Sequence, residues 1–103
     1  MKALGDVFGN LIEMTDERWD HVCEQHPELK SRIKKVVATL QDPDIVKASR
    51  SDRSVRLYCK YFDNLYGGKY ILVVVKSNKR HFLITAYITD YIKAGGELWR
   101  RRD

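Results

Sequence analysis

The sequence is poor in the features that build metal sites, disulfide frameworks and membrane spans. Its only cysteines are Cys23 and Cys59, and it has no paired C-x-x-C or H-E-x-x-H spacing. Cys23 and His26 share one predicted helix face, but only Cys59 and His81 could complete a ligand set, so neither a metal nor a cofactor is predicted. The longest apolar run covers residues 71–75, far short of the roughly 20 residues that span a bilayer.

Targeting and phosphate-loop signals are scarce as well. No apolar signal core follows the early lysine, so we expect a cytoplasmic chain without membrane association. In that compartment two reduced, partly buried thiols are favoured over one disulfide. The pairs Gly67-Gly68 and Gly95-Gly96 are typical of turns rather than of a phosphate-binding loop.

Positive charge is in excess, and it is unevenly distributed. The chain has 19 basic and 14 acidic residues, a net charge of +5. Residues 1–28 hold seven acids and two bases, whereas residues 29–103 hold seven acids and seventeen bases. This asymmetry predicts an acidic helical part and a basic part that faces a polyanion, although bases that only solvate a surface would give the same count.

Length and composition favour one globular domain over residues 1–103, with residues 1–9 as a loose lead-in and 100–103 as a basic tail. A first helix begins after Thr15, because Asp16 and Glu17 place negative charge in its first turn. Pro27 ends that helix near His26 and begins a second one. The second helix has an apolar stripe of Leu29, Ile33, Val36, Val37 and Leu40 and ends at Asp42-Pro43-Asp44.

After residue 44 the apolar period changes to two, which predicts strands over residues 45–48, 55–62, 70–76 and 81–89. A short turn at Asn78 and Lys79 would pair Lys76 with His81 and Val74 with Leu83. That register predicts a core face of Ile71, Val73, Val75, Phe82, Ile84, Ala86 and Ile88. The fold class is therefore α+β, with two N-terminal helices on one face of a four-stranded or slightly larger antiparallel sheet.

The opposite face of this sheet is predicted to be open, polar and aromatic. Val55, Leu57 and Cys59 are assigned to the core by the same alternation, which leaves their neighbours on the open face. Its members are Arg56, Tyr58, Lys60, Tyr70, Lys76, His81, Thr85 and Tyr87. Cations neutralise phosphates and rings stack on unpaired bases, so this set suits single-stranded RNA. The plainer interpretation is that tyrosine and threonine are good strand residues and that lysine protects a sheet edge.

RNA can be cut without a metal, because the ribose 2′-hydroxyl is itself a nucleophile. The reaction needs a base, a cation for the phosphate and an acid for the leaving oxygen. Histidine suits proton transfer near neutral pH, and His26 lies at a helix end from which its side chain could reach the rim of the sheet. It lies equally on the Trp19 stripe, where a structural role is the alternative, while His21 and His81 are interpreted as surface residues.

Several segments together resemble a known family. The segments are Arg18-Trp19-x-His21, His26-Pro27-Glu28, Asp42-Pro43-Asp44, and residues 57–60, 70–76 and 82–90. They are similar to the small phage- and toxin-associated nuclease domains of the barnase, EndoU, colicin and RelE-like ribonuclease superfamily. The similarity covers roughly residues 11–99 and rests on short motifs, and the tail after Asp90 departs from a free-standing RelE-like toxin.

The resemblance implies metal-independent RNA cleavage by 2′-hydroxyl attack, often in a toxin restrained by an acidic antitoxin or inhibitor protein. It maps catalysis onto His26, Lys60, Thr85 and Tyr87. RNA binding would use Arg56, with Tyr58, Tyr70 and Lys76 on the same predicted face. Two alternatives remain open: a module that binds RNA without cutting it, and an interaction domain whose basic face docks an acidic partner. Substrate, cleavage position, ribosome dependence and oligomeric state are not encoded in any of these patterns.

Overall fold

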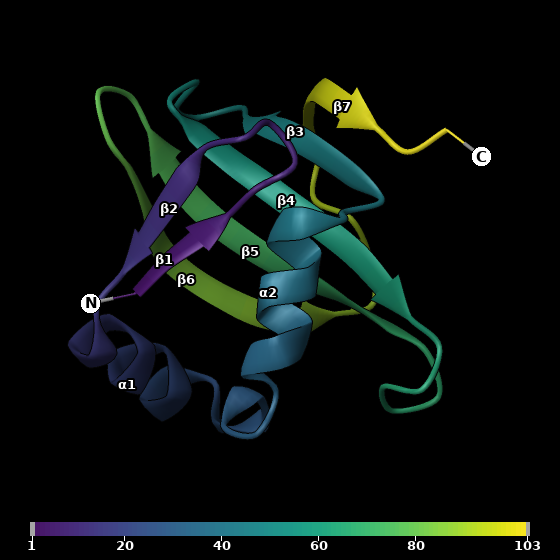
Figure 1. Ribbon diagram of the computed structural model, residues 1–103. Helices are drawn as coiled ribbons and strands as arrows, with labels where there is room; N and C mark the ends of the chain where they lie inside the picture. The colour runs from purple at the N-terminus through teal and green to yellow at the C-terminus, as the bar shows by residue number, and fades with distance from the viewer. Residues whose placement is uncertain (1, 103) are drawn as a thin grey trace.

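Ten short elements build the fold, which we describe from a computed structural model over residues 2–102 (Figure 1). Residues 1 and 103, the outermost positions of the predicted lead-in and tail, lie outside the described residues. The elements are β1 (Lys2–Gly5), β2 (Leu11–Met14), α1 (Asp16–Gln25), the 3-10 turn η1 (Pro27–Leu29), α2 (Ile33–Gln41), β3 (Ile45–Ser49), β4 (Val55–Phe62), β5 (Lys69–Ser77), β6 (His81–Thr89) and β7 (Gly95–Arg100).

All described strands join one sheet, in the order β1-β2-β6-β5-β4-β3-β7. The neighbours pair antiparallel except β2 and β6, which run parallel and meet at the single pair Glu13 and Phe82. The predicted α+β class is confirmed. The four predicted strands are present as β3 to β6, and β1, β2 and β7 make the sheet larger at its two edges. The prediction that the sheet is purely antiparallel is wrong, because β2 runs parallel to β6.

The helical part begins where the sequence predicted. The Thr15 hydroxyl accepts a hydrogen bond from the Arg18 amide at 3.0 Å, and α1 ends with His26 as its C-cap. The second helix differs from the prediction, because Pro27 starts only a 3-10 turn. The chain then re-enters a helix at Ile33 and leaves it at Asp42, as Asp42-Pro43-Asp44 indicated.

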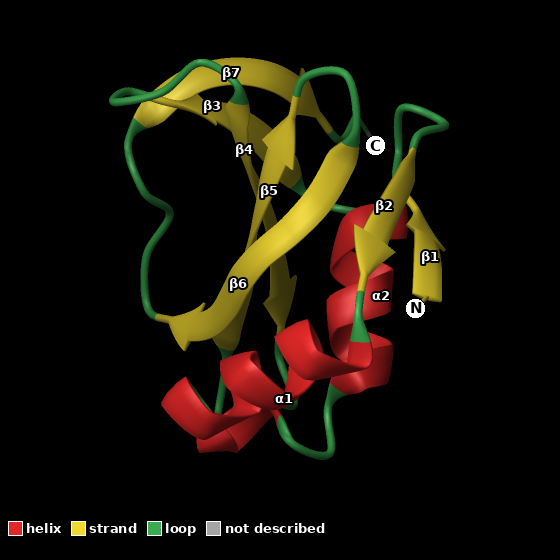
Figure 2. Ribbon diagram, turned by 90° about the vertical axis from the view of Figure 1, so that its left-hand side faces the viewer, coloured by secondary structure: helices red, strands yellow, loops and turns green. Residues whose placement is uncertain are grey.

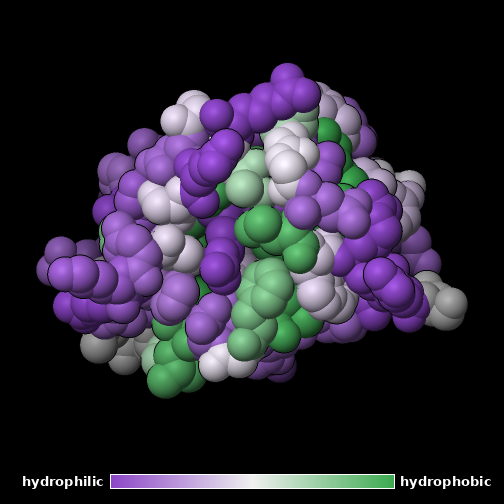
Figure 3. Space-filling view, turned by 90° about the horizontal axis from the view of Figure 1, so that it is seen from above, coloured by the Kyte–Doolittle hydropathy of each residue, from purple (hydrophilic) through white to green (hydrophobic). Residues whose placement is uncertain are grey.

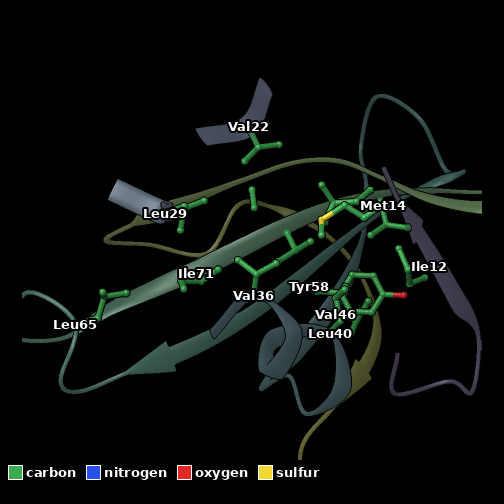
Figure 4. Close-up of a cluster of buried hydrophobic side chains, with 14 residues drawn as sticks. Ile12, Met14, Val22, Leu29, Val36, Leu40, Val46, Tyr58, Leu65 and Ile71 are labelled. Atoms are coloured by element: carbon green, nitrogen blue, oxygen red, sulfur yellow. The ribbon is translucent and has the colours of Figure 1, made fainter. Parts of the chain in front are cut away.

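One face of the sheet, here called the helix face, packs under α2, while α1 lies beside β6 (Figure 2). Tyr58 is fully buried there next to its strand partner Val46 (Figure 4). The cluster includes Ile12, Met14, Val22, Leu29, Val36, Leu40, Val46, Tyr58, Leu65, Ile71, Val73, Val75, Leu83 and Ala86. Burial of these side chains is the main stabilising term of the fold.

The opposite face, here called the outer face, has a second and smaller apolar cluster. Ile45, Leu57, Cys59 and Leu72 are buried there, and Val55, Val74, Tyr87 and Ile92 pack against them. Ile92 belongs to the segment that joins β6 to β7 and crosses this side of the sheet (Figure 2). The middle of the sheet is therefore apolar on both faces, and only its rim on the outer side is open.

This double burial explains why the predicted face of β4 is wrong. Arg56 pairs with Val75, Tyr58 with Val73 and Lys60 with Ile71, so all three side chains lie on the helix face. Leu57 and Cys59, predicted to face the helices, lie on the outer face instead. Alternation alone could not show which set of β4 side chains lies on the helix face, because each set packs against an apolar cluster.

The β5–β6 hairpin contains a bulge that the sequence did not reveal. Val74 pairs with Thr85 but Val75 pairs with Leu83, so Ile84 is an extra residue in β6. A bulge exchanges the faces of all side chains beyond it. The predicted pairs of Lys76 with His81 and Val74 with Leu83 are therefore wrong. Leu83 lies in the helix-face core, and Phe82, predicted to be buried, is 42% exposed on the outer face.

Both ends of the described chain are more ordered than a lead-in and a tail. β1 pairs with β2, and Asp6 in the following turn accepts the Phe8 and Asn10 amides at 3.0 and 2.7 Å. β7 pairs with β3 so closely at Gly95 that a Cβ there would collide with the Ala48 carbonyl. Beyond β7 the Arg101 guanidinium contacts Asp42 and Asp44. The expected lead-in thus contains the edge strand β1, and the basic tail begins at the last residue of the other edge strand, β7.

Candidate functional site

The structure divides the eight predicted site residues between the two faces. Tyr70, Lys76, Thr85 and Tyr87 lie on the outer face, and His26 reaches it from the end of α1. The other three, Arg56, Tyr58 and Lys60, lie on the helix face. The expected single surface therefore does not exist, and the best candidate site is the part of the outer face around His26 and Tyr87.

His26 and Tyr87 form the centre of this candidate site. Their ring centroids lie 5.7 Å apart at an interplanar angle of 32°. The contact arises because α1 ends at His26 and Pro27 turns the chain beside β6. The prediction that His26 reaches the rim of the sheet is confirmed. Its side chain is 32% exposed, so one edge of the ring is open to a ligand.

Glu28 gives His26 an orienting partner. Its Oε2 lies 3.6 Å from His26 Nδ1, which is ion-pair range rather than a hydrogen bond. A carboxylate on this side favours the proton on Nδ1 and leaves Nε2 free to accept one. The arrangement of carboxylate, imidazole and open edge is one that a general base requires.

Two hydroxyl groups lie next to this imidazole on the outer face. Burial raises the pKa of the Tyr87 phenol, and the neighbouring Cys59 and Tyr91 raise it further, so the phenol stays a hydrogen-bond donor at neutral pH. Thr85 lies two residues earlier on the same face, and its Oγ1 is buried without a hydrogen-bond partner. Leaving a hydroxyl unpaired costs about 1–3 kcal/mol, so Thr85 keeps an unused hydrogen-bonding group beside Tyr87.

Aromatic rings and cations extend the site along the outer face. The Tyr70 ring meets Tyr61 edge-on at 5.2 Å. Phe82 lies directly across from Lys76, whose Nζ is 2.7 Å from Asp52 Oδ2. The Lys76 ammonium, with the Ser54 hydroxyl, holds the pKa of the Asp52 carboxyl well below its usual range. Lys76 thus places a positive charge on the outer face, where it is paired with the exposed Asp52 carboxylate.

Tyr58 and Arg56, by contrast, make contacts within the chain that stabilise the fold. The Tyr58 hydroxyl donates to Asp6 Oδ2 at 2.5 Å, and burial followed by that carboxylate raises the pKa of the phenol. The Arg56 guanidinium lies 4.9 Å from the Phe8 ring centroid. These contacts fix the β1–β2 turn on β4. A ring on which bases stack must be exposed, and Tyr58 is not.

Lys60 is likewise used inside the chain. Its Nζ donates to the Asp42 carbonyl at 2.8 Å and lies 3.3 Å from Asp42 Oδ2. Arg101 binds the same carboxylate at 2.6 Å. Lys60 therefore joins β4 to the end of α2, away from the contact between His26 and Tyr87.

The two thiols do not provide an activated nucleophile. Burial raises the pKa of the Cys59 thiol to about 11, and burial, with Asp20, raises the pKa of Cys23. Both cysteines are free and buried. A thiol that stays protonated is a poor nucleophile, so neither cysteine is suited to act as one.

One surface that no sequence pattern indicated is the pocket between the start of α1 and the β5–β6 hairpin. It has a volume of about 450 Å³, and its lining includes Arg18, Lys79 and Phe82. The space-filling view from above shows hydrophobic residues exposed between hydrophilic ones on that side of the molecule (Figure 3). Arg18 belongs to a recognised motif and was assigned no role. Phe82 was assigned to the core, because a bulge leaves no mark in an alternating pattern.

Neither a metal cluster nor a membrane helix is found over residues 2–102. No group of three or more His, Cys, Asp or Glu side chains in that range is placed to hold a metal ion. No helix of that range is both long and apolar enough to cross a bilayer.

Comparison with known proteins adds no identification. No protein-family model matches the chain, and no curated protein or solved structure matches it significantly. The similarity to the ribonuclease superfamily therefore stays a prediction. The functional argument rests on the α+β fold and on the side chains of the outer face.

Proposed function

We propose that this protein is a metal-independent endoribonuclease whose active site is the outer face around His26 and Tyr87. The observation that supports it is the juxtaposition of four groups: an imidazole with an open edge, a carboxylate behind it, a protonated phenol and an unpartnered hydroxyl. Together they can remove a proton and hold a phosphate by hydrogen bonds, which are two of the roles that RNA transesterification requires.

The reaction follows from these roles. His26 Nε2 takes the proton of the ribose 2′-hydroxyl while its oxygen bonds to the adjacent phosphorus. The bond from phosphorus to the 5′-oxygen of the next nucleotide breaks, and that oxygen takes a proton from water. The hydroxide so formed takes the proton held on His26, which restores the base. Tyr87 and Thr85 donate hydrogen bonds to the phosphate as its charge grows. The products are a 2′,3′-cyclic phosphate and a free 5′-hydroxyl.

The proposal departs from the sequence prediction in its cations. Lys60 and Arg56 were expected to bind phosphate, and both lie on the helix face. Lys76 is on the outer face and Arg18 lies at the edge of β6, where its guanidinium is 3.4 Å from the Ile84 carbonyl oxygen. These two take over the electrostatic attraction of RNA.

The location of Lys60 and Arg56 on the helix face favours a second candidate function, a module that binds RNA without cutting it. The cations that should contact a scissile phosphate are not beside His26, whereas exposed rings and Lys76 still line the face. An acidic antitoxin or inhibitor as partner, and a toxin or phage setting, are implied by the family resemblance alone.

Cleavage in the presence of a chelator separates the two candidates. A single-stranded RNA of mixed sequence should be cut in EDTA, and its fragments should end in 2′,3′-cyclic phosphate. An oligonucleotide with 2′-deoxyribose at the cut position should bind but stay intact, because the nucleophile is missing. Binding of RNA without cleavage would favour the binding module. Activity that EDTA abolishes and a divalent ion restores would contradict the metal-independent mechanism.

A further inference from the structure

The pocket beside the β5–β6 hairpin is built differently from the site around His26. Phe82 and Leu83 supply apolar lining, while Arg18, Asn78 and Lys79 surround them with polar groups. Its volume of about 450 Å³ is in the range of small-molecule sites. The pocket lies where β2 leaves β6 after the pair Glu13 and Phe82, so the start of α1 forms its other side.

The bulge at Ile84 gives this pocket its aromatic side chain. Without an extra residue, Phe82 and Thr85 would lie on opposite faces of β6, because their positions differ by an odd number. With it, Phe82, Thr85 and Tyr87 follow one another on the outer face. Their partners Lys76 and Leu72 are four residues apart, which places Phe82 about 13 Å along the strand from Tyr87. Phe82 is 42% exposed, so its ring is available for stacking.

The charge of the pocket complements a phosphate. Arg80 is paired with Glu13 across the β2–β6 junction, and these two charges neutralise each other. Arg18 and Lys79 form no ion pair with any residue in the range 2–102. Two free cations therefore remain beside an exposed ring, and the Asn78 amide can both donate and accept at a base edge.

From these observations we infer that the pocket is a subsite for one nucleotide of single-stranded RNA beyond the two that flank the cleaved bond. Phe82 stacks on its base, and Arg18 and Lys79 neutralise its phosphate. The inference rests on the proposed function for the placement of the scissile bond near His26. A ring flanked by cations and an amide fits a nucleotide better than an acidic peptide, which would need the cations alone.

Binding and cleavage can be measured separately, so the two proposals can fail separately. Binding uses a fluorescent 12-nucleotide oligonucleotide with 2′-deoxyribose throughout, which cannot be cut by this mechanism. Cleavage compares a dinucleotide with longer RNAs extended on one side or the other. The variants are Phe82→Leu, Arg18→Gln and Lys79→Gln. The matched controls are Tyr66→Leu, an exposed ring in the β4–β5 loop, and Lys34→Gln, an exposed cation on α2.

We expect Phe82→Leu to weaken binding about 5- to 100-fold, the usual effect of removing one stacked base. Arg18→Gln and Lys79→Gln should each lower the slope of log affinity against log salt by about 0.7. The loss of kcat/KM should appear on RNA extended to one side and be absent on the dinucleotide. Tyr66→Leu and Lys34→Gln should bind and cleave as the parent does.

Two results would overturn the subsite. One is parent-like binding by Phe82→Leu. If the Arg18 and Lys79 variants still lose affinity in that case, the pocket is a charged surface suited to an acidic protein. The other is an equal loss of cleavage on the dinucleotide and on longer RNA. If the parent cuts no RNA but Phe82→Leu weakens binding, the subsite stands and the proposed ribonuclease activity fails.

Discussion

The helix face and the outer face of the sheet both bury apolar side chains, yet they differ in the partners and the exposure of their polar and aromatic side chains. On the helix face the Tyr58 hydroxyl and the Lys60 ammonium are held by Asp6 and Asp42 of the same chain. On the outer face Tyr70, Tyr87 and Phe82 remain partly exposed, and the Thr85 hydroxyl has no partner. Arg56 Nη1, Ser77 Oγ and His81 Nδ1 on the helix face also lack partners, so the outer face is distinguished by its partly exposed rings rather than by unpaired polar groups.

Apolar burial therefore does not by itself distinguish a face that only stabilises the fold from a face that binds a ligand. Leu57 and Leu72 are as well buried on the outer face as core residues are under α2. What distinguishes the outer face is the set of aromatic rings that the chain leaves partly exposed. The predictions below separate the two faces by whether a substitution changes stability or changes the handling of RNA.

The largest effect is expected at His26. His26→Ala should slow RNA cleavage by about 10²- to 10⁴-fold, the usual contribution of a positioned acid or base. Single-turnover kinetics would measure it, with thermal unfolding as the test of folding. His21→Ala, an exposed histidine of the same helix, is the matched control and should cut normally. Full activity in a folded His26→Ala protein would remove the imidazole from the mechanism.

Leu72→Ala tests whether the outer cluster contributes to stability as the helix-face core does. Leu72 is 1% exposed, and truncation of a buried leucine lowers the free energy of unfolding by about 2–5 kcal/mol. Leu40→Ala in α2 should give a loss in the same range. Urea denaturation of both variants measures the two losses side by side. A loss below about 1 kcal/mol at Leu72 alone would mean that the outer cluster opens readily in solution.

Tyr58→Phe should change stability and leave RNA binding alone. Removal of the hydroxyl leaves the buried Asp6 carboxylate without one of its donors, which costs about 1–3 kcal/mol. A double-mutant cycle with Asp6→Asn would give the coupling energy of the pair. Weaker RNA binding by a folded Tyr58→Phe protein would contradict the assignment of Tyr58 to the helix face.

The smallest effect is expected for single cations, and it compares the faces most directly. Lys76→Gln should lower the slope of log affinity against log salt by about 0.7, because one phosphate contact of a single strand is lost. Lys60→Gln should leave that slope unchanged, since Lys60 lies on the helix face, away from the proposed RNA site. Titrations at several salt concentrations measure both. Equal slopes for the two variants would show that the faces are not electrostatically distinct.

Local sequence signals predicted those parts of the fold that local interactions determine. The start of α1 followed from Thr15 and its acidic first turn, and the bounds of β4 and β6 followed from alternation between turn residues. The meeting of His26 with the sheet rim followed from Pro27. Each of these features depends on residues close together in the chain, so a window of the sequence contains the necessary information.

The parts that failed depend on distant partners. β1 and β7 are short and weakly patterned, and they are strands only because β2 and β3 supply hydrogen-bonding edges. The face of β4 is decided by its register with β5, between two apolar clusters that alternation cannot tell apart. The bulge at Ile84 exchanges the sheet faces on which Phe82 and Leu83 lie, so the pocket could not be predicted from the alternating pattern. The predicted positions of the site residues on β4 were wrong for the same reason, since a side chain can be placed only once the face of its strand is known.

The strand order also has a consequence for the way the protein folds. β4, β5 and β6 form a meander whose contacts join neighbouring segments, so they can form early with little loss of chain entropy. The pairs of β3 with β7 and of Glu13 with Phe82 join segments far apart in the sequence. These must close late in folding. The pocket between α1 and the hairpin exists only after that last closure, whereas the Thr85 and Tyr87 side of β6 is already in place.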